Sequence, residues 1–171
     1  MVKCELPKLE LWVRFPSSAP SLGGIMSKLF IYYSFTGNGD LVAEKMKEYG
    51  YDTFKIIPKK SLPKSFFWGV MTGGFLAAIN HKPKLVDFNV DVSKYDEIVI
   101  GSSIWNGKIA CPTASALDKL DLTGKKVSFV LYSGGGESPK AIEYLKNKYN
   151  AKVIEMKEPK KYGLDALVEF K

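Results

Sequence analysis

Residues 28–40 read KLFIYYSFTGNGD, a short apolar run that passes directly into a polar loop with two glycines. The run itself, residues 28–33, has the length and aromatic content of a buried strand. The segment that follows, residues 38–49, places Leu41 and Met46 on one helical face. A strand, a polar loop and a helix in this order form the first half of a βαβ unit.

The same alternation continues along the chain. Further strands are predicted over residues 52–57, 95–100, 126–132 and 152–156, and further helices over residues 112–120, 138–149 and 164–170. Because parallel strands joined through helices form right-handed crossovers, this pattern predicts an α/β fold, an open doubly wound five-stranded parallel sheet with helices on both faces. Ligands bind such sheets outside the carboxyl ends of the strands.

Composition excludes several classes of protein. The chain has 171 residues, of which 46% are hydrophobic and 25% charged, as expected for about one globular domain. Two distant cysteines and the single histidine His81 argue against a disulfide scaffold, a zinc site and a Ser-His-Asp triad. Few cysteines fit a reducing, cytoplasmic location. The longest apolar run, residues 66–79, has 14 residues, short of the ~20 that span a membrane.

The charge balance is basic but rests on lysine. Lys and Arg together number 25 against 18 acidic residues, and Arg14 is the only arginine. Base-edge reading and bidentate phosphate binding favour arginine, so we do not expect sequence-specific nucleic-acid binding. Dispersed lysines are typical of a solvated surface, with attraction to an anionic partner or substrate as the functional alternative.

Residues 1–25 differ from the rest of the chain. They hold two adjacent glycines and several prolines, without an apolar period or the pattern of a secretory signal. We expect residues 1–25 to be a poorly ordered, non-native extension, with Met26 as the natural start and residues 26–171 as the domain.

Three loops that follow strands carry the candidate site. Residues 34–40 supply glycines, hydroxyls and a helix N-terminus, the parts of a phosphate cradle, although a generic turn is the alternative. Neither a Walker A loop nor the dinucleotide fingerprint is present. Trp105 sits in the loop after the third strand, where it stacks on a ligand or folds back on its own domain. The loop at residues 134–136 has three glycines, which allow a flat ligand to approach or make a flexible loop.

The three loops meet at one edge of the predicted sheet, where a phosphate and a large aromatic ring fit together. FMN has this shape. Residues 28–156 resemble the flavodoxin family, on the motifs Tyr-Ser-Phe-Thr-Gly-Asn after the first strand and Gly-x-x-x-Trp-x-Gly-Lys after the third. The resemblance implies strand order 2-1-3-4-5, with FMN at the switch between strands one and three.

The resemblance also implies a set of cofactor residues, with no catalytic side chain and no metal. The phosphate is held with little help from lysine, Trp105 stacks on the flavin, and the peptide between Asn106 and Gly107 passes near its N5 atom. The implied cofactor-binding residues are Ser34, Phe35, Thr36, Gly37, Asn38, Gly39, Ser102, Ser103, Ile104, Trp105, Asn106, Gly107, Ser133, Gly134, Gly135 and Gly136.

The chain departs from the family pattern at three points. Gly39 stands where the family has a threonine, and Asp40 beside it would repel a phosphate if it pointed inward. The loop at residues 134–136 lacks the tyrosine that covers the outer flavin face in many flavodoxins, and the chain is basic where electron carriers are acidic.

These features favour an FMN-binding electron-transfer protein that works with a redox partner, as a monomer or dimer. One alternative is an FMN-dependent oxidoreductase acting on a nicotinamide or a quinone, and another is a flavin-free binding module. The extra segment 65–82 is expected to form an amphipathic helix packed on the sheet edge, with a flavin flap, a self-association face or a weak membrane-surface contact as alternatives. Trp68 lies off the apolar stripe of this helix, which consists of Phe66, Phe67, Val70, Met71, Gly74, Phe75 and Ala78. Cys111 is expected to be buried and His81 exposed.

Overall fold

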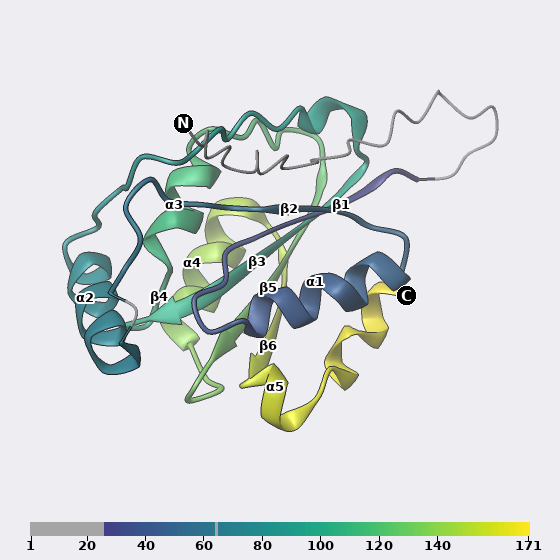
Figure 1. Cartoon of the computed structure of the whole chain (residues 1–171). Helices are drawn as coiled ribbons and strands as arrows, with labels where there is room; N and C mark the ends of the chain where they lie inside the picture. The colour runs from purple at the N-terminus through teal and green to yellow at the C-terminus, as the bar shows by residue number, and fades with distance from the viewer. Residues whose placement is uncertain (1–25, 64) are drawn as a thin grey trace, which may run out of the picture.

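A parallel sheet runs through the centre of the computed structural model, which describes residues 26–63 and 65–171 (Figure 1). The expectation for residues 1–25 lies outside the described part of the chain. The strands are β1 (Lys28–Tyr32), β2 (Asp52–Lys55), β3 (Glu97–Trp105), β4 (Lys108–Ile109), β5 (Lys126–Ser133) and β6 (Lys152–Lys157). The sheet order is β2-β1-β3-β5-β6, with β4 paired only to β3. The five parallel strands therefore have the predicted 2-1-3-4-5 order.

Helices connect these strands. They are α1 (Asn38–Glu48), α2 (Phe66–Ala78), α3 (Cys111–Leu117), α4 (Pro139–Tyr149) and α5 (Pro159–Tyr162), with 3-10 turns η1 (Val92–Lys94) and η2 (Asp165–Phe170). The helix expected over residues 164–170 is thus a 3-10 turn, and the short α5 before it was not expected.

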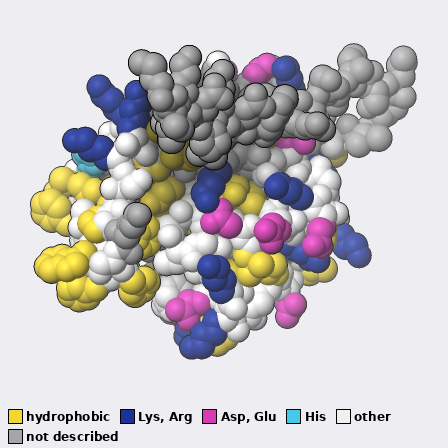
Figure 2. All heavy atoms as spheres, viewed as in Figure 1, with side chains coloured by type: hydrophobic (Ala, Val, Ile, Leu, Met, Phe, Trp, Pro, Cys, Tyr) yellow, Lys and Arg dark blue, Asp and Glu magenta, His cyan; other side chains and the backbone are white. Residues whose placement is uncertain are grey.

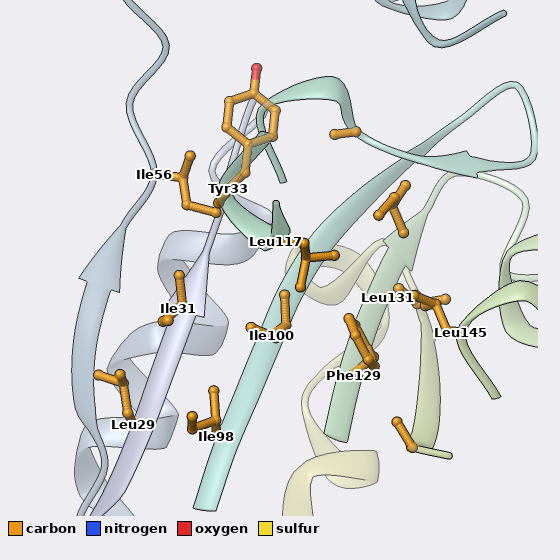
Figure 3. Packing of buried hydrophobic residues seen from close by; sticks show 14 of the residues in the cluster. Leu29, Ile31, Tyr33, Ile56, Ile98, Ile100, Leu117, Phe129, Leu131 and Leu145 are labelled. Carbon is orange, nitrogen blue, oxygen red and sulfur yellow. The ribbon is translucent and has the colours of Figure 1, made fainter. Parts of the chain in front are cut away.

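Successive strand residues point into two separate cores because side chains alternate across a sheet. On one face, Leu29, Ile31 and Ile100 pack with Leu117 of α3 and Leu145 of α4 (Figure 3). The opposite face forms a second buried cluster, in which Phe30, Val99 and Val130 pack with Val42 and Met46 of α1 and with Leu167 and Phe170 of η2. Burial on both faces explains why the strands are continuously apolar.

A hairpin extends the third strand beyond its expected end. β3 continues through Trp105, turns at Asn106 and Gly107, and pairs back antiparallel as β4. Both turn residues have positive φ, 50° at Asn106 and 70° at Gly107, as a two-residue type I′ hairpin requires. Trp105 therefore belongs to a strand rather than to an open loop.

Helix α2 faces the sheet with its small residues, opposite to the expected orientation. Gly69, Gly73 and Ala77 are buried, whereas large apolar residues such as Phe67 and Phe75 are exposed. Two aromatic rings explain the inversion: a Cβ on Gly69 would collide with Phe35, and one on Gly73 would fall inside the Trp105 indole. Only glycine lets the helix backbone approach these rings so closely.

Candidate functional site

The carboxyl ends of β1, β3 and β5 meet at one edge of the sheet, as expected. The backbone N–H of Tyr33 donates to the Gly101 carbonyl at 3.1 Å, and the Tyr132 hydroxyl donates to the Tyr33 carbonyl. The Ser133 carbonyl accepts a hydrogen bond from the Glu158 N–H at 3.1 Å. The three predicted loops therefore start from strand ends that lie next to one another, together with the connection from β6 to α5.

The loop after β1 presents backbone donors without a protein partner. Gly37, with φ of 84°, is the N-cap of α1, and no side chain of the described residues caps this helix. The first turn of a helix carries unsatisfied N–H groups and the positive end of the helix dipole. The hydroxyl of Ser34 is also buried, close enough to the Asp40 carboxylate to help lower its pKa, and it makes no hydrogen bond of ordinary geometry in the described part of the chain. These groups can bind an anion.

Lys160 of α5 adds a cation to this loop. Its ammonium donates to the Thr36 carbonyl at 2.7 Å, and its backbone N–H donates to Asn38 Oδ1 at 3.1 Å. The Asn38 amide in turn donates to the Thr36 hydroxyl at 3.1 Å. A side chain at Gly37 would collide with the Lys160 ammonium. Sequence analysis missed Lys160, because only the fold brings it to a loop 124 residues earlier.

Asp40, which was expected to threaten phosphate binding, is held by a cation. Lys55 of β2 donates to its carboxylate at 2.6 Å, and the Tyr32 hydroxyl donates to the same oxygen at 3.1 Å. Burial favours a higher pKa for Asp40, but the hydrogen bond and charge of Lys55 outweigh it and lower the pKa. Asp40 therefore stays ionised beside the loop, and the ammonium of Lys55 balances its charge.

The absence of a side chain at Gly39 has a steric reason. A Cβ at Gly39 would lie 2.9 Å from Cζ of the Tyr132 ring and closer still to its hydroxyl. Tyr132 is fully buried, and this burial, ahead of the nearby Tyr32 and Asp40, raises its pKa well above the ordinary value. The hydroxyl is thus a neutral donor that ties β5 to the end of β1.

Trp105 is half-buried between the first loop and α2. Its ring meets Phe35 edge to face, with centroids 5.3 Å apart and an interplanar angle of 72°. Gly73 lies against another part of the indole. Trp105 therefore packs in part on its own domain, which was the alternative to stacking on a ligand. Its contact with Phe35 brings the predicted ring site next to the predicted phosphate loop.

The glycine loop after β5 is open. A Cβ at Gly134 or Gly135 would meet nothing within 4 Å, and both residues are exposed. Gly136 differs, because its φ is 80° and its N–H donates to the Ser133 hydroxyl at 2.8 Å. A hydrogen bond therefore closes the base of the loop, and the outer part of the loop is exposed.

One cavity borders the first loop, and another borders the hairpin turn. One of about 560 Å³ is lined by Ser34, Phe35 and Thr36 together with residues 55–58. The other, of about 600 Å³, lies beyond the hairpin turn and is lined by residues 106–109, Cys111 and side chains of α3 and α4. Burial raises the pKa of the Cys111 thiol, which makes it a poor nucleophile, and His81 is exposed as expected.

Comparisons with solved structures find the same fold in flavoproteins. A flavoprotein of Lactobacillus acidophilus NCFM, solved in complex with FMN, has a TM-score of 0.62 and 23% identity over 76% of this chain and 91% of its own. A protein of Bacteroides eggerthii DSM 20697 assigned as a flavoprotein has a TM-score of 0.67 and 20% identity over 80% of this chain and 93% of its own. This chain has the flavodoxin-like fold.

A third protein with this fold, from Bacteroides uniformis ATCC 8492 and also assigned as a flavoprotein, has a TM-score of 0.66 and 19% identity over 80% of this chain and 94% of its own. No protein-family model matches the sequence, and no curated protein does. The flavodoxin-like fold is therefore recognised from structure and topology, at low sequence identity.

Proposed function

We propose that this protein binds FMN at the carboxyl edge of its sheet and serves as an electron-transfer flavoprotein. One observation carries the proposal: an uncapped helix N-terminus, the buried hydroxyl of Ser34 and the ammonium of Lys160 converge on one loop, next to Trp105. These groups fit a dianionic phosphate attached to a flat aromatic ring. The FMN complex of a structural neighbour agrees with this choice of ligand.

The phosphate would be held by the loop of residues 34–39. The backbone N–H groups of the first turn of α1, the hydroxyls of Ser34 and Thr36 and the Asn38 amide supply the donors, and Lys160 supplies the positive charge. Lys55 keeps the Asp40 carboxylate engaged, which lessens its repulsion of a phosphate. Riboflavin lacks the phosphate and therefore has no phosphate oxygens to accept hydrogen bonds from these groups.

The ring would lie between Trp105 and the open glycine loop, with Ser103 and Ile104 along its side. Ser102, which was also expected to line the ring, is instead fully buried, and its hydroxyl donates to that of Thr113 at 3.0 Å. Bound FMN supplies the redox chemistry, while the protein adjusts its potential through stacking, backbone dipoles and nearby charge. The turn at Asn106 and Gly107 offers an adjustable dipole, because its central peptide can rotate while Gly107 takes φ of either sign.

Replacement of Trp105 tests the ring site. Trp105→Ala is expected to weaken FMN binding roughly 5- to 100-fold, corresponding to ~1–3 kcal/mol of stacking, and to shift the flavin potential. Trp68→Ala is the matched control, because Trp68 is exposed on the outer face of α2. Fluorescence titration with FMN and a reductive titration measure both quantities. Unchanged affinity and potential in Trp105→Ala would remove Trp105 from the site.

A second candidate function is an FMN-dependent oxidoreductase that takes hydride from a nicotinamide or passes electrons to a quinone. The exposed glycines 134 and 135 favour it, because no side chain among the described residues stands over them. Rapid NAD(P)H oxidation with a quinone, in the absence of an added reductase, would support the oxidoreductase over the carrier. A chain that takes up no FMN would instead be a flavin-free binding module.

A further inference from the structure

The outer face of α2 exposes large apolar side chains, which are uncommon on the surface of a folded protein. The side chains of Phe67, Trp68 and Phe75 are 63%, 62% and 64% exposed. Figure 2 shows hydrophobic side chains gathered at the end of the molecule where Figure 1 places α2. The further exposed apolar residues of this helix and its C-cap are Phe66, Val70, Met71 and Ile79.

The area of this face exceeds that of incidental surface residues. The three rings of Phe67, Trp68 and Phe75, each with about 150–250 Å² of surface and roughly two-thirds of it exposed, present about 300–450 Å². Contiguous apolar patches above a few hundred Å² mark interaction surfaces in soluble proteins. The face therefore has the size of an interaction surface.

Positive charge surrounds the same helix. Residues 53–86 contain six lysines and no acidic residue, whereas the rest of the chain contains 19 basic and 18 acidic residues. Lys55 and Lys82 pair with Asp40 and Asp118 outside this segment, whereas Lys59, Lys60 and Lys84 form no ion pair within the described part of the chain. Helix α2 itself carries no charged residue.

The lysines before and after α2 are brought together by backbone pairing. The Lys59 N–H donates to the Lys84 carbonyl at 2.8 Å, and the Val86 N–H donates to the Ile57 carbonyl at 2.8 Å. The side chains of Lys59, Lys60 and Lys84 are exposed. A cationic cluster therefore lies beside the apolar helix rather than being spread around the molecule.

The helix cannot rotate to hide its apolar face. Gly69 and Gly73 are fitted against the Phe35 and Trp105 rings, and any other face would bring a side chain into these rings. Lys108 of the hairpin also donates to Asn80 Oδ1 at 2.8 Å, next to the C-terminal end of α2. The exposed orientation is thus fixed by packing.

We propose that α2 is a membrane-surface helix that docks the protein on an anionic bilayer. Its aromatic side chains enter the boundary between headgroups and acyl chains, and the neighbouring lysines contact lipid phosphates. The helix lies on the bilayer: its 13 residues span ~20 Å, short of the ~30 Å hydrocarbon core. Among the described residues, no helix has the length and apolarity to cross a membrane.

Charge favours lipid over a second copy of the chain. A two-fold dimer through α2 would place two copies of the cluster formed by Lys59, Lys60 and Lys84 next to one another. An anionic headgroup layer neutralises the same cluster. This inference does not depend on FMN binding, because the apolar face and the lysines lie outside the proposed phosphate loop.

Co-sedimentation of the full chain with lipid vesicles tests the proposal. The chain is expected to bind vesicles that contain phosphatidylglycerol, to bind pure phosphatidylcholine vesicles weakly, and to release as salt rises. Val70→Glu on α2 should weaken binding by roughly tenfold or more, since it removes buried apolar carbons. Val168→Glu is the matched control, because Val168 is the same residue type and is 63% exposed on η2, against 45% for Val70 on α2.

The lysines are tested in the same assay. Lys59→Gln combined with Lys60→Gln should weaken binding by roughly 25-fold, the effect of ~1 kcal/mol per lysine. Lys119→Gln combined with Lys146→Gln, two exposed lysines of α3–β5 and α4, should leave it nearly unchanged. Circular dichroism checks that each variant is folded.

Three results would overturn the proposal. The first is a full chain that binds neither kind of vesicle and is monomeric, in which case another segment or a protein covers α2. The second is a lipid-free dimer that Val70→Glu dissociates and vesicles do not disrupt, which identifies a second copy as the occupant. The third is equal loss of vesicle binding in Val70→Glu and Val168→Glu, which removes α2 from the contact.

Discussion

At the proposed phosphate loop, single side chains from distant parts of the chain decide which charges would face the ligand. The hydroxyl, amide and glycine residues of the loop are adjacent in sequence and could be predicted as a cradle. Lys160 and Lys55 could not, because nothing local connects them to residues 36 and 40. Lys55 lies on β2, and Lys160 lies on α5, which follows β6. The fold places both lysines near the start of α1.

Lys160 should discriminate FMN from riboflavin. Lys160→Ala is expected to weaken FMN binding roughly 10- to 100-fold, since hydrogen bonds to charged groups contribute ~1.5–3 kcal/mol. Riboflavin binding should change little, because riboflavin has no phosphate. Lys161→Ala is the control: its neighbouring ammonium is exposed and faces Glu158 at 4.0 Å. Equal losses for both flavins in Lys160→Ala would contradict a phosphate contact.

The pair of Asp40 and Lys55 predicts a pH dependence of stability. Because the folded pKa of Asp40 is lowered, its ionised form stabilises the folded state above the unfolded pKa of about 4. This contribution is lost as the pH falls through the folded value. Asp40→Asn should therefore unfold at lower urea than the parent at neutral pH, and the difference should shrink in acid.

The effect of Asp40 is expected to be small, because its side chain is 40% exposed and that of Lys55 is 43% exposed. Lys55→Gln should reduce the same acid dependence. Parallel stability curves for the parent and Asp40→Asn from neutral to acid pH would show that the ion pair does not stabilise the fold.

At the scale of an element, α2 shows how a sequence pattern can predict a helix and mislead about its orientation. Helical spacing of large apolar residues correctly predicts the helix within residues 65–82, because the period is a property of the segment alone. The same pattern predicts that the large residues face the core. The bulk of Phe35 and Trp105, residues outside the segment, reverses the face.

Two adjacent glycines of α2 should respond oppositely to alanine. Gly73→Ala would place a methyl inside the Trp105 ring and should destabilise the protein by about 1–3 kcal/mol or more, with a changed tryptophan emission. Gly74→Ala meets nothing within 4 Å and should stabilise by up to ~1 kcal/mol through helix propensity. Urea unfolding measures both. A stabilising Gly73→Ala would contradict the close packing of α2 on Trp105.

The hairpin of β3 and β4 could have been predicted from the local sequence, but the third strand was expected to end at residue 100. Asn-Gly is a strong hairpin signal, and Asn106 and Gly107 adopt the positive φ that it implies. The serines and glycine at residues 101–103 favoured a loop in the sequence, but in the structure they continue a central strand.

Across the whole molecule, the alternation of strands and helices predicted the layers, the parallel sheet and the edge where the site lies. Each strand alternates residues between two cores, so the pattern and the fold agree at every central strand. The terminal turns α5 and η2 were harder to predict because they are short and depend on docking against α1. Those turns carry Lys160 and complete the second core.

The central claim is that this edge of the sheet binds FMN, and equilibrium titration of flavin-free protein with FMN tests it most directly. The account predicts saturable uptake of one FMN per chain, with quenched flavin emission and much weaker binding of riboflavin. A folded chain that shows no saturable uptake of FMN would contradict the account and leave the flavodoxin-like fold serving another purpose.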